Sequence, residues 1–81
     1  MSTLAVETYP LAQDVRCTDD ELIVTLVDGR RLAVPLLWFP KLAEATQEQR
    51  RHYDLLGDGE GIHWPDIDED LSVNGLLRGT H

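Results

Sequence analysis

The sequence predicts a small α+β domain, in which a small antiparallel sheet built on a β-hairpin carries one or two short helices. Its 81 residues allow one domain and no more. Residues 22–27 are apolar except for Thr25 and are rich in β-branched side chains, and Asp28-Gly29 follows them as a typical turn pair. Strand-like segments lie on both sides of a helix-like segment, which favours α+β over a parallel βαβ array.

The N-terminal segment, residues 1–11, contains Tyr9-Pro10 and shows little periodicity. We expect a loose arm there, with a short edge strand as the alternative, and a single domain over residues 12–81. Residues 14–18 alternate weakly and predict a first strand. Asp19-Asp20 is typical of the tight turn that would follow it.

The register of the hairpin depends on the length of the loop at Asp28-Gly29. A three-residue loop places Val24 opposite Leu32, whereas a two-residue loop shifts the pairing by one position. Only the three-residue loop gathers the apolar residues of both strands on one face: Leu22, Val24, Leu26, Leu32 and Val34. We therefore predict a type I turn with Gly29 at positive φ as a G1 bulge.

The segment after the hairpin carries signals for two short helices. Pro35 ends the return strand because it has no N–H to donate to the ladder. Pro40 suits the first turn of a helix over residues 41–45. Thr46 and Gln49 have the spacing of a capping box, so helix is expected to continue or restart there through His52.

The last third of the chain is expected to hold two short strands, an acidic loop and a final helix, at residues 53–56, 62–64, 66–70 and 73–78. Three glycines in residues 57–61 predict a mobile connection between the two strands. Pro65 ends the second strand, and Ser72 is a suitable N-cap for the helix.

The charge of the chain is strongly negative. Fifteen acids against seven Lys and Arg give a net charge of −8, which opposes non-specific nucleic-acid binding and favours encounter with a basic partner. Seven of the acids lie between Asp54 and Asp70, a stretch without Lys or Arg. No apolar stretch is long enough to span a bilayer, no secretory signal is apparent, and Cys17 is the single cysteine. We therefore expect a cytoplasmic protein with no membrane partner.

The spacing Asp66-x-Asp68-x-Asp70 resembles the opening of a calcium loop. The pattern fails because Leu71 stands where a glycine is needed and Leu77 where a bidentate glutamate is needed. We expect no metal site here. A solvated acidic turn that caps the last helix and a recognition surface for a basic partner both remain open.

Catalytic signatures are weak in this sequence. His63 lies between Ile62 and Trp64 and is expected to point outward if those two point inward. A nucleophile-and-base set would need Cys17 or a serine close to His63, and no spacing marks one. The glycine-rich segment is acidic and precedes a strand, so it is not a phosphate cradle. We expect no catalytic residue, no cofactor and no enzyme activity, with a metal-dependent or hydrolytic enzyme as the remote alternative.

The order of several segments resembles the bacterial domain-of-unknown-function family 2442: residues 26–30, 34–42, 45–46, 49–50, 61–65, 68–73 and 75–77. The most specific block is Trp64-Pro65 with the acids that follow it. The resemblance implies a small bacterial protein without an assigned activity, often one half of a two-gene cassette, and hence an antitoxin-like partner role. Some relatives carry a helix-turn-helix after this domain, and with His81 as the last residue we do not expect operator binding of that kind.

These observations lead us to expect a protein-binding module. Both tryptophans and Phe39 are candidates either for an aromatic core or for an interface patch. The residues that we predict to bind a partner are Trp38, Trp64, Asp66, Asp68, Glu69 and Asp70. The predicted partner is a basic protein and not a nucleic acid. A homo-oligomer is compatible with so small a core. A structural or accessory subunit of a larger bacterial complex of the defence or CRISPR type is the alternative, and such a subunit would show a large apolar face.

Overall fold

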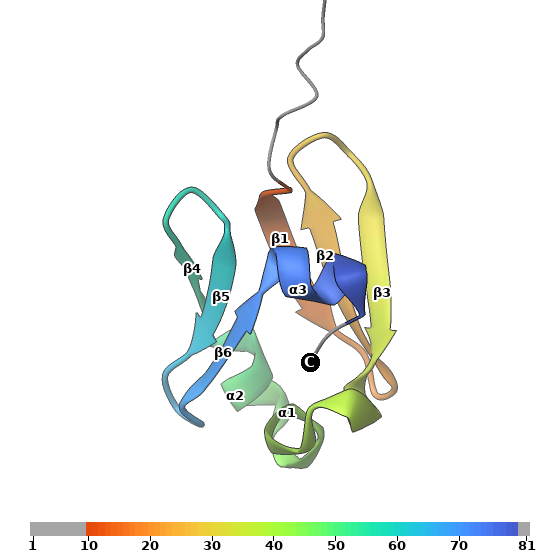
Figure 1. Cartoon of the computed structure of the whole chain (residues 1–81). Coiled ribbons are helices and arrows are strands. Elements are labelled where there is room, and N and C mark those ends of the chain that lie inside the picture. Colours follow the sequence, from red (N-terminus) through yellow and green to blue (C-terminus); the bar gives the residue numbers. More distant parts are fainter. Residues whose placement is uncertain (1–9, 80–81) are drawn as a thin grey trace, which may run out of the picture.

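The computed structural model describes residues 10–79, which form two three-stranded antiparallel sheets and four short helices (Figure 1). The first sheet has the order β1-β2-β3, with bounds Ala12–Cys17, Glu21–Leu26 and Arg31–Pro35. The second has the order β4-β5-β6, with bounds Asp54–Leu56, Gly61–Trp64 and Glu69–Ser72. The helices are the 3₁₀ helix η2 and the α-helices α1, α2 and α3, with bounds Leu36–Trp38, Pro40–Glu44, Gln47–Arg51 and Val73–Arg78. The predicted α+β class is confirmed.

The helices lie where the two sheets meet. In Figure 1 the sheets stand side by side, α1 and α2 lie together at one end, and α3 lies between β6 and β3. The buried core draws on both sheets and on η2, α1 and α3, and Leu22, Leu42, Ile62, Trp64 and Val73 are among its fully enclosed side chains. No helix in residues 10–79 is long and apolar enough to cross a membrane.

The hairpin of β2 and β3 has the predicted three-residue loop. Val24 pairs with Leu32 and Leu22 with Val34, so the apolar set shares one face. Gly29 has φ of 96°, and its N–H donates to the carbonyl of Leu26 at 2.9 Å. The predicted register and the positive φ of Gly29 are both confirmed.

The first strand begins at Ala12, two residues earlier than the pattern predicts. The carbonyl of Leu11 accepts from the N–H of Val27 at 2.9 Å, and the N–H of Ala12 donates to the carbonyl of Gly59 at 2.7 Å. These long-range bonds extend the strand beyond its weakly alternating part. The predicted arm falls almost entirely on residues 1–9, which lie outside the described residues.

The helix ends follow the local sequence signals. Pro40 is the first residue of α1. Thr46 and Gln49 form both hydrogen bonds of a capping box at the start of α2. The hydroxyl of Ser72 accepts from the N–H of Gly75 at 3.1 Å and caps α3. The predicted caps at Thr46 and Ser72 are confirmed, and they satisfy backbone donors that a helix start leaves unpaired.

Two predictions for the last third need correction. Residues 69–70 are not loop, because Glu69 pairs with Trp64 and Asp70 with His63 as part of strand β6. The prediction from strand propensity is wrong here because pairing with β5 outweighs the poor intrinsic preference of acidic residues for strands. The glycine-rich connection is not uniformly loose either, since Gly59 is buried against Ala12.

Candidate functional site

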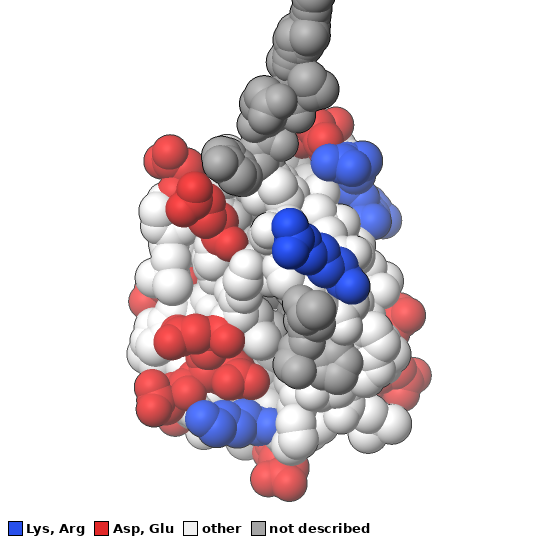
Figure 2. All heavy atoms as spheres, in the orientation of Figure 1, with Lys and Arg blue, Asp and Glu red and all other residues white. Residues whose placement is uncertain are grey.

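The candidate site is the acidic surface, which we define as Asp66, Asp68, Glu69 and Asp70. These residues form the turn after β5 and the first half of β6, and all are exposed except Glu69, which is half-buried. Asp68 has φ of 52°, the left-handed conformation that lets the chain reverse between the strands. Figure 2 shows acidic side chains gathered on the side of the molecule where β6 lies, with basic atoms at their lower border. Asp66, Asp68, Glu69 and Asp70 therefore lie within one short stretch of chain, in which Glu69 and Asp70 point to opposite faces of β6.

The alternation of β5 and β6 decides which way these side chains point. Ile62 and Trp64 are fully buried, so His63 between them faces outward, as predicted. Asp70 lies opposite His63, and its carboxylate contacts the Nδ1 of that ring. Asp54 of β4 is the neighbour of His63 on its other side. One outward row across the sheet is thus Asp54, His63 and Asp70.

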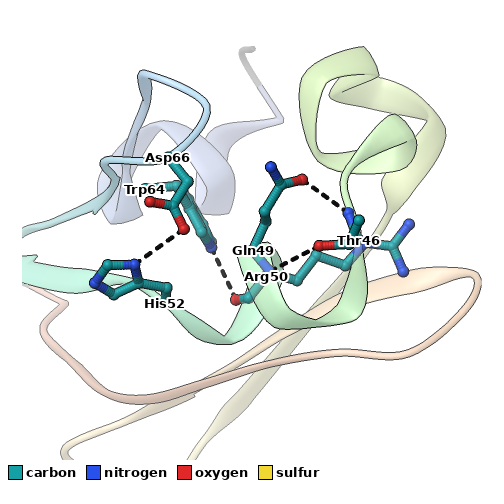
Figure 3. Close-up of polar contacts among 6 residues, drawn as sticks. All are labelled: Thr46, Gln49, Arg50, His52, Trp64 and Asp66. Carbon is teal, nitrogen blue, oxygen red and sulfur yellow. Dashed lines mark hydrogen bonds and ion pairs between the residues drawn. The ribbon is translucent and has the colours of Figure 1, made fainter.

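A second histidine pairs with the acidic surface. The Nδ1 of His52 lies 3.0 Å from a carboxylate oxygen of Asp66 (Figure 3). This hydrogen bond and the charge of Asp66 raise the pKa of His52, with smaller contributions from the carboxylates of Asp54 and Glu48. Desolvation opposes the rise. The imidazolium form of His52 is therefore the form that the acidic surface favours.

We predict that Asp66→Asn lowers the pKa of His52 toward the ordinary histidine value of about 6.5. Because the pKa of His52 is raised in the folded protein, its pairing with Asp66 stabilises the fold below the unfolded-state pKa. That stabilisation is lost as the pH rises through the folded-state pKa. An NMR titration of the His52 ring protons measures the change. Asp70→Asn is the control, because it removes an equal charge from the acidic surface at a residue that does not contact His52. A similar shift of the His52 pKa in both variants would contradict the pairing of His52 with Asp66.

The aromatic part of the predicted site divides between core and surface. Trp64 is 0% exposed, and its Nε1 donates to the carbonyl of Arg50 at 3.0 Å (Figure 3). Trp64 thus belongs to the aromatic core, which was the alternative to an interface patch, and it offers no exposed surface to a partner. A tryptophan is stable inside a small core when its one polar group has an acceptor, and Arg50 provides it.

Trp38 remains a surface residue. It is 38% exposed, and its neighbour Leu37 is 85% exposed, because the turn of η2 buries Leu36 and Phe39 instead. Leu37 was missed in the predicted site, although the three-residue spacing of Leu36 and Phe39 would have left it outside a 3₁₀ turn. We name Leu37 and Trp38 the apolar corner. Lys41, in the next helix, donates to the carbonyl of Asp68 at 3.0 Å, so this part of the chain borders the acidic surface.

Candidate groups for metal binding or covalent catalysis lie apart. Within residues 10–79, no three His, Cys, Asp or Glu side chains are placed to hold one metal ion. Cys17 is half-buried on β1, and burial raises the pKa of its thiol, against a smaller opposing effect of the Arg50 charge. His63 lies on the second sheet, away from Cys17, and its ring contacts Asp70 of the neighbouring strand β6.

The chain matches one protein family over most of its length. The model described as "Protein of unknown function (DUF2442)" matches residues 12–81, and the chain belongs to this family. A crystal structure of a protein of unknown function from Rhodospirillum rubrum ATCC 11170 is similar, with a TM-score of 0.77, 33% identity and 90% of each chain covered. None of the curated proteins matches the chain. The resemblance seen in the sequence is confirmed at the level of the family.

Proposed function

We propose that this chain is a non-catalytic protein-binding module whose acidic surface binds a basic protein. The observation that carries the proposal is the concentration of exposed carboxylates on the β5–β6 turn and β6. Long-range attraction between such a surface and a basic partner speeds encounter and fixes orientation more than it adds affinity. An additional apolar contact is therefore needed for tight binding.

The apolar corner supplies that contact in our proposal. Leu37 and Trp38 expose apolar surface close to the acidic surface, which Lys41 borders through its bond to Asp68. Tryptophan is enriched among residues that contribute most to binding energy. A partner that covers both areas would pair its cations with the carboxylates and bury the exposed part of the Trp38 ring.

The partner that we propose is the product of a neighbouring gene, in an antitoxin-like pair. An acidic module of this kind would cover a basic, RNA-facing surface of its partner and compete with the phosphate backbone for it. The acidity of the chain supports this arrangement because it opposes direct binding of the chain to nucleic acid.

The experiment is co-purification of the chain with the neighbouring gene product, followed by an affinity measurement on the pair. We expect the triple variant Asp66→Asn, Asp68→Asn and Asp70→Asn to weaken binding by about tenfold or more, which corresponds to about 1.4 kcal/mol. Asparagine is the suitable replacement because it tolerates the positive φ of Asp68. Trp38→Ala should weaken binding as well while the domain stays folded.

The matched control neutralises three acids at the β1–β2 turn. Asp19→Asn, Asp20→Asn and Glu21→Gln change the net charge by the same amount at another exposed part of the chain. We expect affinity to change by less than about twofold in that control. Equal weakening of binding by both triple variants would show that only net charge matters. Unchanged co-purification of the partner with the Asp66, Asp68 and Asp70 triple variant would overturn the proposal.

A further inference from the structure

A hollow between β1 and α2 has the opposite charge from the acidic surface. Three of the seven Lys and Arg residues of the chain line it, namely Arg16 from β1 and Arg50 and Arg51 from α2. It encloses about 300 Å³, at the low end of the roughly 300–1,000 Å³ that is typical of ligand sites. A local excess of positive charge in a chain with a net charge of −8 is not expected from composition alone.

Arg50 is held in place by backbone groups and not by a carboxylate. Its Nε donates to the carbonyl of Leu42 and its Nη2 to the carbonyl of Ala43, both at 2.9 Å. Its own carbonyl accepts from Trp64, as Figure 3 shows. The charge of Arg50 is therefore fixed in the wall of the hollow before any ligand arrives. Fixed charges bind with a smaller loss of side-chain entropy than mobile ones.

Arg16 and Arg51 are exposed, and neither forms an ion pair with a side chain of residues 10–79. Guanidinium groups bind the oxygens of phosphate through paired N–H donors, and such charge-assisted bonds are about twice as strong as neutral ones. The amide of Gln47 adds a neutral donor to the same wall. The thiol of Cys17, which burial keeps protonated, adds no competing charge.

One carboxylate opposes an anion in this hollow. Asp14 lies in the wall, and one of its oxygens accepts from the hydroxyl of Tyr53 at 3.4 Å. Three guanidinium groups and one carboxylate leave a local charge of +2, which matches a phosphate dianion. We propose that the hollow between β1 and α2 binds a phosphate group through Arg16, Arg51 and Gln47, with Arg50 as a fixed positive charge behind them.

A second, smaller hollow shares Asp14 and Arg16 with the first and adds Arg31. Positive charge therefore continues along the outer face of the first sheet. A phosphate ester with an organic group would extend into this second hollow, whereas inorganic phosphate would fill only the first. A change at Arg31 should therefore affect the binding of a phosphate ester but not that of inorganic phosphate.

The test is an NMR titration of the full chain with sodium phosphate, with sodium chloride used to hold the ionic strength constant. We expect saturable shifts of the amides of residues 15–17 and 47–51. Arg16→Gln and Arg51→Gln should each weaken binding by about tenfold, and Asp14→Asn should strengthen it several-fold.

Adenosine monophosphate serves as the ester. If Arg31→Gln weakens binding of adenosine monophosphate but leaves binding of inorganic phosphate unchanged, the ligand is a phosphate ester. If Arg31→Gln changes the binding of neither ligand, the hollow recognises the phosphate group alone.

Arg30→Gln is the matched control, because Arg30 is exposed, carries the same charge and pairs with Asp28 at 2.8 Å away from the hollow. Binding should change by less than about twofold in this variant. Unsaturable shifts, or equal weakening by Arg30→Gln and Arg16→Gln, would overturn the proposal. The residues involved are separate from the acidic surface, so failure here leaves the proposed protein-binding function unaffected.

Discussion

Trp64→Ala is expected to lower the free energy of unfolding by about 3–5 kcal/mol, the usual cost of removing a large buried aromatic ring. Trp64 is fully enclosed, and its ring centroid lies 6.4 Å from that of Tyr53. Its Nε1 also satisfies the carbonyl of Arg50, so the variant leaves both a cavity and an unpaired acceptor. Urea denaturation followed by circular dichroism measures the loss.

A graded series makes this prediction testable even if the alanine variant is largely unfolded. Trp64→Phe retains much of the ring but removes the N–H donor, and we expect it to cost about 1–3 kcal/mol. Trp38→Ala is the control, because Trp38 is 38% exposed and its ring makes an edge contact with that of Phe39. Its cost should be about 1 kcal/mol or less. Similar costs for Trp38→Ala and Trp64→Ala would contradict the division between surface and core.

The parts of the fold that could be predicted are those with local causes. The register of the hairpin follows from apolar alternation and from Asp28-Gly29, and the helix starts follow from Thr46 and Ser72. Strand β6 has no comparable local signal, because Glu69 and Asp70 disfavour strands by themselves. Pairing with β5 and the left-handed turn at Asp68 make the strand, and neither is visible in a short window of sequence.

In the candidate site, too, some features have local causes and others depend on contacts between distant parts of the chain. Charged side chains are rarely buried without partners, so Asp66, Asp68 and Asp70 could be placed at the surface from their type alone. The position of Trp64 could not, because its burial depends on an acceptor fourteen residues earlier in the chain. The basic hollow was also hidden, since Arg16 and Arg51 meet only when α2 packs beside β1.

Gly59 is the second position where a single change should be severe. Its φ of 111° lies in a region that L side chains rarely adopt. A Cβ at this position would lie 2.5 Å from the carbonyl oxygen of Ala12 and 2.9 Å from its nitrogen. These are backbone atoms of β1, so they cannot move aside as a flexible side chain would. The hydrogen bond from Ala12 to Gly59 joins β1 to the β4–β5 turn, and the contact must open to admit a methyl group.

We therefore expect Gly59→Ala to cost roughly 2–5 kcal/mol, as the sum of backbone strain and overpacking. Gly29→Ala is the matched control, because Gly29 also has a positive φ, 96°, but a Cβ there meets no atom within 4 Å. Strain alone should cost that variant roughly 1–3 kcal/mol. Urea denaturation gives both values, and hydrogen exchange at the Ala12 amide should be faster only in Gly59→Ala. Equal costs in the two variants, with unchanged protection of Ala12, would show that the approach of Gly59 to β1 contributes nothing to stability.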